Sequence, residues 1–335
     1  MKSKFTLRSF LLAAGSSLLA ISSASAQSGT WDEDANGTWS TATNWFSDVI
    51  ATGSGNTANF TNDITADRIV SLDADRTLTN VIFGDNDTAT AGSWVLDNNG
   101  LSTNNLNLAG TTPTITVNTL GTGKTAEISA IITGSAGLTK AGDGTLILSN
   151  TNTYSGNTVI SAGTLQVGNG GTTGIATGTI SIANGARLVI KRSDGITPGV
   201  ISGQGSVTLT TSSTLTLSNS NSFSGGFTLN GGQVGGLTTG TYNGFGTGLL
   251  TINGGSLRGP NTTSAIVIPN NVAWNANVGF GRAQGGAPNF TFNGDVTLGA
   301  SVAASTASGS DAILTYYQWK YQSIILWIRN CLQLR

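Results

Sequence analysis

ITGSAGLTKAGDGTLILSNTNTYSGNTVISAGTL, residues 132–165, returns without a gap as ISGQGSVTLTTSSTLTLSNSNSFSGGFTLNGGQV, residues 201–234. Both copies have the same order of short strands, glycine turns, a Ser-Asn turn and an aromatic-Ser-Gly step. Such a repeat indicates a stack of similar units and not one globular unit around a pocket. A stranded solenoid coil takes roughly 20 to 30 residues, so the distance between the copies is expected to hold about three coils.

The composition favours strands and turns over helices. The chain has 47 glycines, five prolines and one methionine, and no long stretch has helical periodicity. Apolar residues instead alternate with single intervening residues, as in Leu146 and Leu148, Leu165 and Val167, Ile180 and Ile182, Leu188 and Ile190, and Leu215 and Leu217. This period of two predicts an all-β fold, a single elongated β-solenoid whose strands have one apolar face and one neutral polar face.

Charged residues make up only 9% of the chain. Coils of a solenoid lie about 4.8 Å apart, so a charge repeated at one coil position would face its own sign in the next coil. Neutral Thr, Ser and Asn can stack there without repulsion, and Gly and Asn suit the corners. Low-complexity disorder is the alternative, and the regular apolar alternation argues against it.

Residues 1–26 have the features of a secretory signal peptide. Lys2, Lys4 and Arg8 precede an apolar run from Phe10 to Ile21, and Ala24-Ser25-Ala26 supplies a cleavage site before Gln27. The run is too short for a membrane span, although an uncleaved anchor stays open as the alternative. We therefore expect an exported protein with no membrane span in the mature chain.

The charge distribution divides the rest of the chain. Residues 27–315 carry 9 basic and 16 acidic residues, a net charge of −7, so the basic patch that nucleic-acid binding requires is missing. The acids gather between Asp32 and Asp97, where only Arg68 and Arg76 oppose them. We expect an acidic, Trp-containing N-terminal β region or cap at 27–100, a solenoid repeat body at 101–315 and a non-repeat tail at 316–335.

The residues that most catalytic sites need are missing. The sequence has no histidine, which removes Ser-His-Asp and Cys-His nucleophile systems and His-containing zinc and iron sites. Its single cysteine, Cys331, lies in the tail, so residues 27–315 have no disulfide. We expect no catalytic residue, no cofactor-binding residue, no metal ligand and no cofactor.

Paired carboxylates are the remaining route to an enzyme, because a glycoside hydrolase needs two of them about 5 to 9.5 Å apart. The body offers Glu127, Asp143, Asp194, Asp295 and Asp311, none of which forms a close sequence pair. Asp143 lies in Gly142-Asp143-Gly144 and Asp194 in Ser193-Asp194-Gly195, both typical of turns. We interpret these acids as turn residues.

Two features of the N-terminal region have competing interpretations. Residues 32–37, DEDANG, match the opening of a calcium loop, but Thr43 stands where an EF-hand needs a bidentate Glu, so an acidic turn is favoured over a calcium site. Trp31, Trp39 and Trp45 could stack on sugars if exposed or close the first coil if buried. We favour the cap over glycan binding.

Residues 137–170, GLTKAGDGTLILSNTNTYSGNTVISAGTLQVGNG, resemble the autotransporter-associated β-strand repeat, also called the passenger-associated transport repeat. The matching positions are Gly137, Leu138, Lys140, Gly142, Gly144, Thr145, Leu146, Leu148, Asn152, Tyr154, Gly156, Thr158, Gly163, Thr164 and Leu165. The second copy departs from the motif, with Leu209 in place of the Lys and Phe223 in place of the Tyr. The Trp spacing, Ala58-Asn59-Phe60 and residues 81–84, VIFG, are similar to the leader region of exported bacterial proteins with this repeat.

The resemblance implies a right-handed parallel β-helix exposed on the cell or released from it, and it implies no catalytic residue. Residues 316–335, YYQWKYQSIILWIRNCLQLR, contain no glycine and break the pattern. We interpret them as a truncated or frameshifted end, with an amphipathic membrane-binding helix as the alternative. An uncapped last coil would then favour end-to-end self-association.

The sequence thus predicts a secreted or cell-surface passenger-like protein with a structural or adhesive role and no enzyme activity. The expected partners are extracellular glycans, matrix or other cells, with no nucleic acid. Repeated flat faces favour many weak contacts over one deep pocket. A polysaccharide-binding module and a carboxylate-dependent polysaccharide-degrading enzyme on a β-helix stay open as alternatives.

Overall fold

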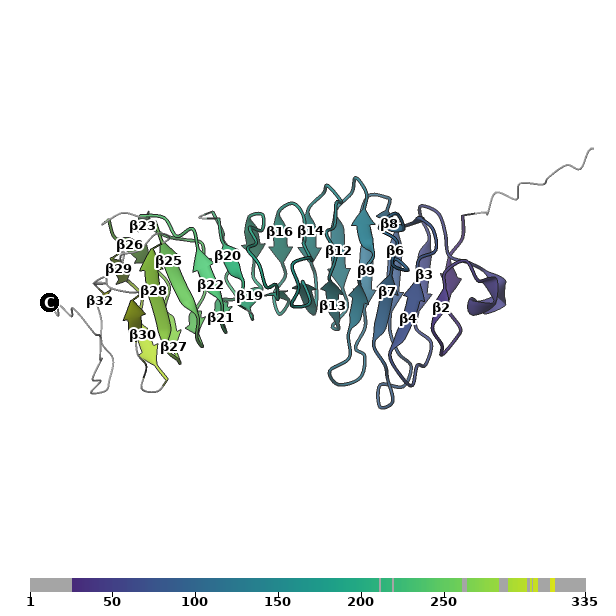
Figure 1. Ribbon diagram of the computed structural model, residues 1–335, viewed down its shortest axis with the longest axis horizontal. Coiled ribbons are helices and arrows are strands. Elements are labelled where there is room, and N and C mark those ends of the chain that lie inside the picture. Colours follow the sequence, from purple (N-terminus) through teal and green to yellow (C-terminus); the bar gives the residue numbers. More distant parts are fainter. Residues whose placement is uncertain are drawn as a thin grey trace, which may run out of the picture.

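The chain folds as a rod of stacked parallel strands (Figure 1). The computed structural model describes residues 26–316 except 211, 219, 261–263, 283–288, 300–301, 303 and 307–313. All pairings between its named strands are parallel, as in the ladders of β13 with β15 and β27 with β30. This arrangement confirms the predicted all-β solenoid. The predicted signal peptide and the tail lie outside the described residues, apart from Ala26 and Tyr316.

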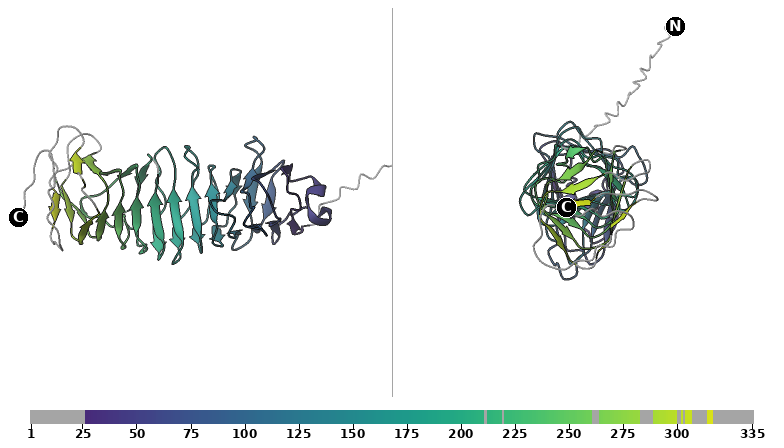
Figure 2. Two further views of the ribbon diagram at one scale, coloured as in Figure 1. Left: turned by 90° about the horizontal axis from the view of Figure 1, so that it is seen from below. Right: turned by 90° about the vertical axis from the view of Figure 1, so that its left-hand side faces the viewer.

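Each coil passes along three sides of the rod, which we call sides one, two and three in chain order. Figure 2 shows the rod from below and along its axis. Side one begins with an eight-stranded sheet, called sheet 1. Its strands are β1 (Gly29–Thr30), β3 (Thr57–Phe60), β6 (Asn80–Phe83), β9 (Thr114–Val117), β12 (Leu138–Ala141), β14 (Thr158–Ile160), β16 (Ile180–Ile182) and β18 (Ile201–Gly203).

Side two is one twelve-stranded sheet, called sheet 2, which extends over the whole rod. Its strands are β2 (Gly37–Thr38), β4 (Arg68–Ser71), β7 (Trp94–Asp97), β10 (Ala126–Ile128), β13 (Thr145–Leu148), β15 (Thr164–Val167), β17 (Arg187–Ile190), β19 (Ser206–Leu209), β21 (Phe227–Leu229), β24 (Leu250–Ile252), β27 (Val272–Trp274) and β30 (Val296–Leu298). Two short 3-10 helices, η1 (Ala42–Asn44) and η2 (Phe46–Asp48), follow β2 at the N-terminal end.

Smaller sheets complete the rod. Side three starts with β5 (Arg76–Leu78), β8 (Asn105–Leu108) and β11 (Ile131–Thr133). It resumes with β20 (Thr214–Thr216), β22 (Gln233–Gly235), β25 (Ser256–Gly259), β28 (Val278–Arg282) and β31 (Ala304–Thr306). In the C-terminal part, a sheet of β23 (Gly240–Thr241), β26 (Ile266–Ile268), β29 (Phe290–Phe292) and β32 (Leu314–Tyr316) takes the place of sheet 1 ahead of sheet 2.

The inward faces of the strands form one continuous apolar core. Leu146, Leu165, Leu188 and Val207 pair in register on successive strands of sheet 2, and each is fully buried. The predicted alternation is confirmed, because the outward Ser181 is exposed between the buried Ile180 and Ile182. Aliphatic stacking from coil to coil therefore holds the rod together without a disulfide in the described residues.

The two repeat copies, residues 132–165 and 201–234, are separated by three coils plus one side of the rod. Along sheet 2 the register runs from Leu146 through Leu165 and Leu188 to Val207, and each of these three steps is one coil. The chain then turns one corner to Leu215, the equivalent of Leu146, which lies on β20 of side three and not on sheet 2. The expected count of about three coils is thus refined. The second copy lies one side further around the rod than the first.

Coil length separates the N-terminal region from the rest. Trp94 pairs with Ala126 on sheet 2, so this coil takes many more residues than the coil between the paired Leu146 and Leu165. The coils from β2 to β10 are all longer than those from β10 to β30. The longer coils contain the corner loops in which most of the acidic residues lie. This difference in coil length matches the concentration of acids before Asp97.

Neutral side chains stack between coils as the low charge content predicts. The Asn253 side-chain amide donates to Asn230 Oδ1 over 2.7 Å, and the Asn275 amide donates to Asn253 Oδ1 over 2.9 Å. These three asparagines follow β21, β24 and β27 at the same corner. An amide can donate to one neighbour and accept from the other, which a carboxylate or an ammonium cannot do.

Candidate functional site

The three clustered tryptophans close the N-terminal end of the core. Trp31 and Trp39 are fully buried, and Trp45 is 2% exposed. The ring centroids of Trp39 and Trp45 lie 4.9 Å apart in an edge-on contact, and Trp39 packs 5.5 Å from Phe60 of the next coil. Such aromatic contacts stabilise the end of a stack that would otherwise expose apolar side chains. The three rings are buried, as the cap interpretation predicts, and they do not form an exposed sugar platform.

Each indole nitrogen of the cap also has a hydrogen-bond partner. Trp39 Nε1 donates to the Ala51 carbonyl over 3.0 Å, and Trp45 Nε1 donates to the Trp39 carbonyl over 2.8 Å. Trp31 Nε1 donates to the Glu33 carbonyl over 2.9 Å. A buried indole N–H without a partner would be costly, so these bonds fix the three rings in one arrangement.

The DEDANG stretch is an acidic turn that binds the neighbouring coil. Asp34 accepts hydrogen bonds from the backbone and side chain of Thr65 and pairs with Arg68, whose Nε lies 2.6 Å from Asp34 Oδ1. The hydrogen bond from Arg68 contributes most to lowering the pKa of Asp34 to about 2. Asn36 Oδ1 accepts from the backbone N–H of Ile69 over 2.8 Å. The side-chain oxygens of Asp34 and Asn36, the third and fifth positions of the calcium-loop match, are therefore used for contacts between coils.

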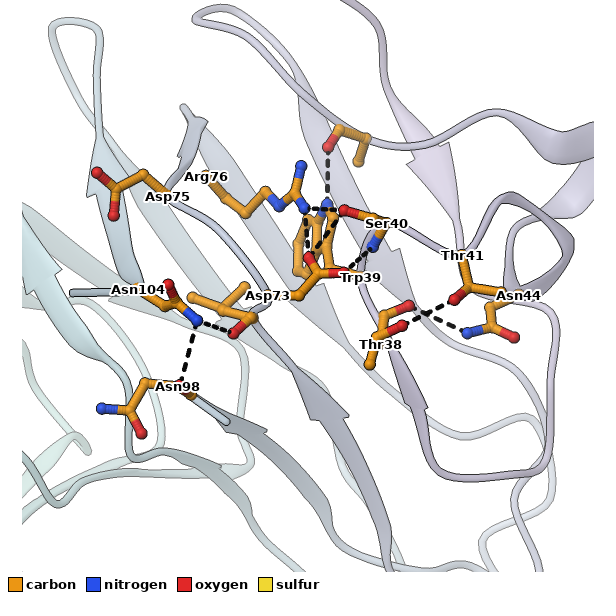
Figure 3. A network of polar contacts seen from close by, with 12 residues as sticks. Thr38, Trp39, Ser40, Thr41, Asn44, Asp73, Asp75, Arg76, Asn98 and Asn104 are labelled. Atoms are coloured by element: carbon orange, nitrogen blue, oxygen red, sulfur yellow. Dashed lines mark hydrogen bonds and ion pairs between the residues drawn. The ribbon is translucent and has the colours of Figure 1, made fainter. Parts of the chain in front are cut away.

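Other aspartates of the acidic region connect neighbouring coils in the same way. Figure 3 shows Asp73 between Ser40 and Arg76. Burial raises the pKa of Asp73, but the hydrogen bonds from Ser40 and Arg76 outweigh it and the net shift is downward. Asp75 Oδ1 accepts from the backbone N–H of Asn105 over 2.8 Å. These carboxylates therefore hold the long N-terminal coils together.

We expect the N-terminal coils to weaken in acid. The pKa of Asp34 is below its ordinary value in the folded chain, so its contribution to stability is present above pH 3.8 and is lost as the pH falls through 2. The protection factors of residues 29–71, which correct for the intrinsic pH dependence of amide exchange, should fall from pH 4 to pH 2 in the wild type. Asp34→Asn should flatten this pH dependence, and an unchanged profile would contradict the assignment.

Buried asparagines clamp three successive coils in each repeat copy. Asn152 Oδ1 accepts from the backbone N–H of Ile132, and its amide nitrogen donates to the Ile175 carbonyl, at 3.0 and 2.9 Å. Asn221, the equivalent residue of the second copy, accepts from Ile201 N–H and donates to the Gly244 carbonyl, at 2.8 and 2.9 Å. Both side chains are 4% exposed. The motif asparagine is thus a structural clamp with equivalent partners in both copies.

The motif tyrosine, Tyr154, forms a second polar contact, with Thr158. Both residues of this contact are replaced in the second copy. Tyr154 Oη lies 2.8 Å from Thr158 Oγ1 and accepts from the backbone N–H of Thr177. Burial raises the pKa of Tyr154, which keeps the phenol protonated. The positions equivalent to Tyr154 and Thr158 are Phe223 and Phe227, and both rings are fully buried. Loss of the hydroxyl and loss of its threonine partner occur together.

Lys140 of the motif points into the rod. Its side chain is fully buried, and Nζ donates to the carbonyls of Ala141, Gly142 and Ala162 over 2.9, 2.7 and 3.2 Å. Burial lowers the pKa of Lys140 to about 8. The ammonium therefore ties the turn after β12 to the corresponding turn of the next coil. The second copy has the apolar Leu209 at this position.

Lys140→Met is expected to lower the free energy of unfolding at pH 7 by about 1–3 kcal/mol, because three carbonyls lose their donor. The lysine pKa is lower in the folded chain than its ordinary 10.5, so wild-type stability should rise from pH 8 to pH 10.5. The substitution should remove that rise. Urea unfolding at pH 7, 8, 9 and 10 measures both effects. If the unfolding free energies of the two proteins changed equally with pH, the assignment would be contradicted.

A close backbone approach explains two motif glycines. A Cβ at Gly156 would lie 2.2 Å from the backbone nitrogen of Gly137 in the preceding coil, and a Cβ at Gly137 would lie 2.1 Å from the Asn157 carbonyl oxygen. No other residue fits at this corner without moving the backbone. With the clamps and the buried lysine, the motif positions are used for contacts inside the rod.

The carboxylates of the repeat body occupy structural positions. Asp143 lies in the bend between β12 and β13, and Asp194 lies in a bend and pairs with Arg192 Nε at 2.8 Å. The hydrogen bond from Arg192 lowers the pKa of Asp194. Glu127 Oε2 accepts from the Asn169 side chain over 3.1 Å. The turn positions of Asp143 and Asp194 are confirmed, whereas Asp311 lies outside the described residues.

Metal-binding clusters and membrane-spanning helices are absent from the described residues. No group of three or more His, Cys, Asp and Glu side chains in this part of the chain is arranged to hold a metal ion. No helix within the described ranges is long and apolar enough to cross a membrane.

Comparison with known proteins agrees with the geometry of the two copies. The family model of the passenger-associated transport repeat matches residues 138–167 and 207–234, which include both asparagine clamps. The adhesin BmaC autotransporter of Brucella suis biovar 1 (strain 1330) is 44% identical over 80 residues, 23% of this chain and 2% of the adhesin. No solved structure matches the chain significantly. Residues 138–167 and 207–234 therefore match the passenger-associated transport repeat, and their motif positions supply coil-to-coil contacts of a parallel β-solenoid.

Proposed function

We propose that this chain forms an exported rod at the bacterial cell surface, with an adhesive role and no catalytic activity. The observation that carries the proposal is the inward use of the repeat motif. Leu138, Lys140, Leu146, Asn152 and Tyr154 are all buried, so the motif builds the rod and leaves its outer faces free to vary. The local likeness to an adhesin autotransporter supports a surface role.

The chemistry of a stacked rod favours adhesion. Its outer faces repeat from coil to coil, so a partner that is itself repetitive can make the same weak contact many times. Extracellular glycans, matrix and other cells are partners of this kind. Catalysis finds less support, because Asp34, Asp73 and Asp194 are engaged in ion pairs.

Adhesion is testable with the protein on a cell surface. Residues 27–335 would be displayed on a non-adherent bacterium, and adherence to matrix-coated wells and to cultured cells would be counted. We expect at least a tenfold increase over cells displaying an unrelated β-solenoid. Equal adherence, with display verified by antibody, would contradict the adhesive role.

The absence of catalysis has its own test. Purified residues 27–335 would be incubated with neutral and uronate-containing polysaccharides, and new reducing ends and unsaturated products would be measured. We expect no product. Any product above that of a reaction without protein would contradict the absence of catalysis and support the alternative of a polysaccharide-degrading enzyme.

A further inference from the structure

The outer face of sheet 1 has two rows of side chains in register. The first row is Thr57, Asn80, Thr114, Thr139, Val159, Ser181 and Ser202. The second row is Thr30, Asn59, Ile82, Thr116 and Ala141. All of them are partly or fully exposed, whereas the residues between them are buried. We call these two rows the sheet 1 face.

The sheet 1 face has no charged residue over its eight strands. Lys140 is the single charged residue on those strands, and it points into the rod. Sheet 2 differs, because Arg68, Glu127 and Arg187 lie on its strands and are at least partly exposed. An uncharged face of this length loses no ionic solvation when a partner covers it.

The rim of the face is acidic. Asp63 and Asp85 follow β3 and β6 directly after the corner of the coil, and Asp143 follows β12. Burial raises the pKa of Asp63, and repulsion from the nearby charges of Asp85 and Asp87 raises it further. A polyanion such as a uronate polymer, a nucleic acid or an anionic membrane would meet this repulsion.

Several polar groups of the face have no partner within the described residues. Asn80 donates to Thr57 Oγ1 over 3.3 Å, and Thr114 donates to the Thr112 carbonyl. By contrast, the hydroxyls of Thr116, Thr139 and Ser181 form no side-chain hydrogen bond in this part of the chain. Between them stand apolar groups, of which Val159 is 39% exposed. The face thus alternates free hydroxyls with small apolar patches.

We propose that the sheet 1 face binds a neutral, unbranched polysaccharide that lies along the rod axis. Thr139 and Ser181 stand two coils, about 9.6 Å, apart, so their hydroxyls can bond alternate sugar units, while Val159 between them and Ile82 contact the apolar faces of the rings. Each contact is weak, and their number supplies the affinity. The proposal rests on the adhesive function and specifies its ligand and its surface.

Sedimentation with insoluble polysaccharides tests the proposal. Purified residues 27–335 would be mixed with microcrystalline cellulose, chitin and, as an acidic comparison, insoluble polygalacturonate. The face variant carries Thr139→Lys and Ser181→Lys, two coils apart on sheet 1. The matched control carries Thr228→Lys and Ala273→Lys, two coils apart on the outer face of sheet 2. Circular dichroism would verify that both variants fold.

We expect the wild type and the control to bind a neutral polymer and the face variant to bind it at least tenfold more weakly. Absence of wild-type binding to both neutral polymers would overturn the proposal, as would equal loss in both variants or stronger binding to polygalacturonate. The matrix and cell adherence assay separates the adhesive function from the proposed binding at the sheet 1 face. Adherence that survives in the face variant would leave the adhesive function standing and reject the sheet 1 face as its site.

Discussion

Trp39→Ala is expected to lower the free energy of unfolding of the N-terminal coils by about 3–5 kcal/mol, the usual cost of truncating a buried tryptophan. The ring is fully buried and packs against Trp45 and Phe60. Its removal opens a cavity and leaves the Ala51 carbonyl without its donor. Stability in a stack is largely local, so the effect should concentrate in the first coils and fade along the rod.

Hydrogen exchange measured by mass spectrometry resolves this prediction by segment. Residues 29–60 of Trp39→Ala should exchange much faster than in the wild type, while residues 180–260 should change little. Phe46→Ala is the matched control, because Phe46 directly follows Trp45 but is 63% exposed, and its effect should stay within about 0.5 kcal/mol. Similar protection in all three proteins would show that the tryptophans do not close the stack.

Asn152→Ala is expected to destabilise the coils of the first repeat copy by about 2–4 kcal/mol, because the buried N–H of Ile132 and the carbonyl of the half-buried Ile175 lose their partners. Each orphaned group costs about 1–3 kcal/mol. Asn221→Ala should have a similar effect in the second copy, because its two partners are equivalent. Denaturant unfolding combined with segment-resolved hydrogen exchange measures both.

Two comparisons make the clamp prediction specific. Asn184→Ala, in an exposed turn, should change the stability by less than about 0.5 kcal/mol. Asn152→Asp keeps the acceptor for Ile132 but removes the donor to Ile175, so it should also destabilise at neutral pH. If Asn152→Ala behaved like Asn184→Ala, the clamp would not contribute to coil stacking.

The sequence predicts those parts of the fold that depend on local patterns. Alternation at Leu146 and Leu148 shows which side chains face inward, because the period of two is a property of the strand itself. The buried cap at Trp31, Trp39 and Trp45 also follows from composition and position. The coil-to-coil role of Asp34 does not, because its partner Arg68 is 34 positions away and no local rule relates the two residues.

The position of the second repeat copy is a different case. The offset between the copies gives the sequence distance after which the pattern recurs. The side of the rod on which it recurs depends on the number of residues in each corner loop. Leu138 lies on sheet 1, whereas its equivalent Val207 lies on sheet 2. The joint replacement of Tyr154 and Thr158 by Phe223 and Phe227 is visible in the two aligned copies, and it signals a direct contact between the first pair.

The most direct test of the stacked rod measures how distance grows with coil number. In a Cys331→Ser background, spin labels would be placed at Ser202 with Thr114 and, separately, at Ser202 with Thr57, all on the outer row of sheet 1. At about 4.8 Å per coil, four steps predict about 19 Å between backbones and six steps predict about 29 Å. Electron–electron double resonance should therefore give the second pair a distance about 10 Å longer. Equal distances, or a shorter one for the second pair, would contradict the parallel solenoid.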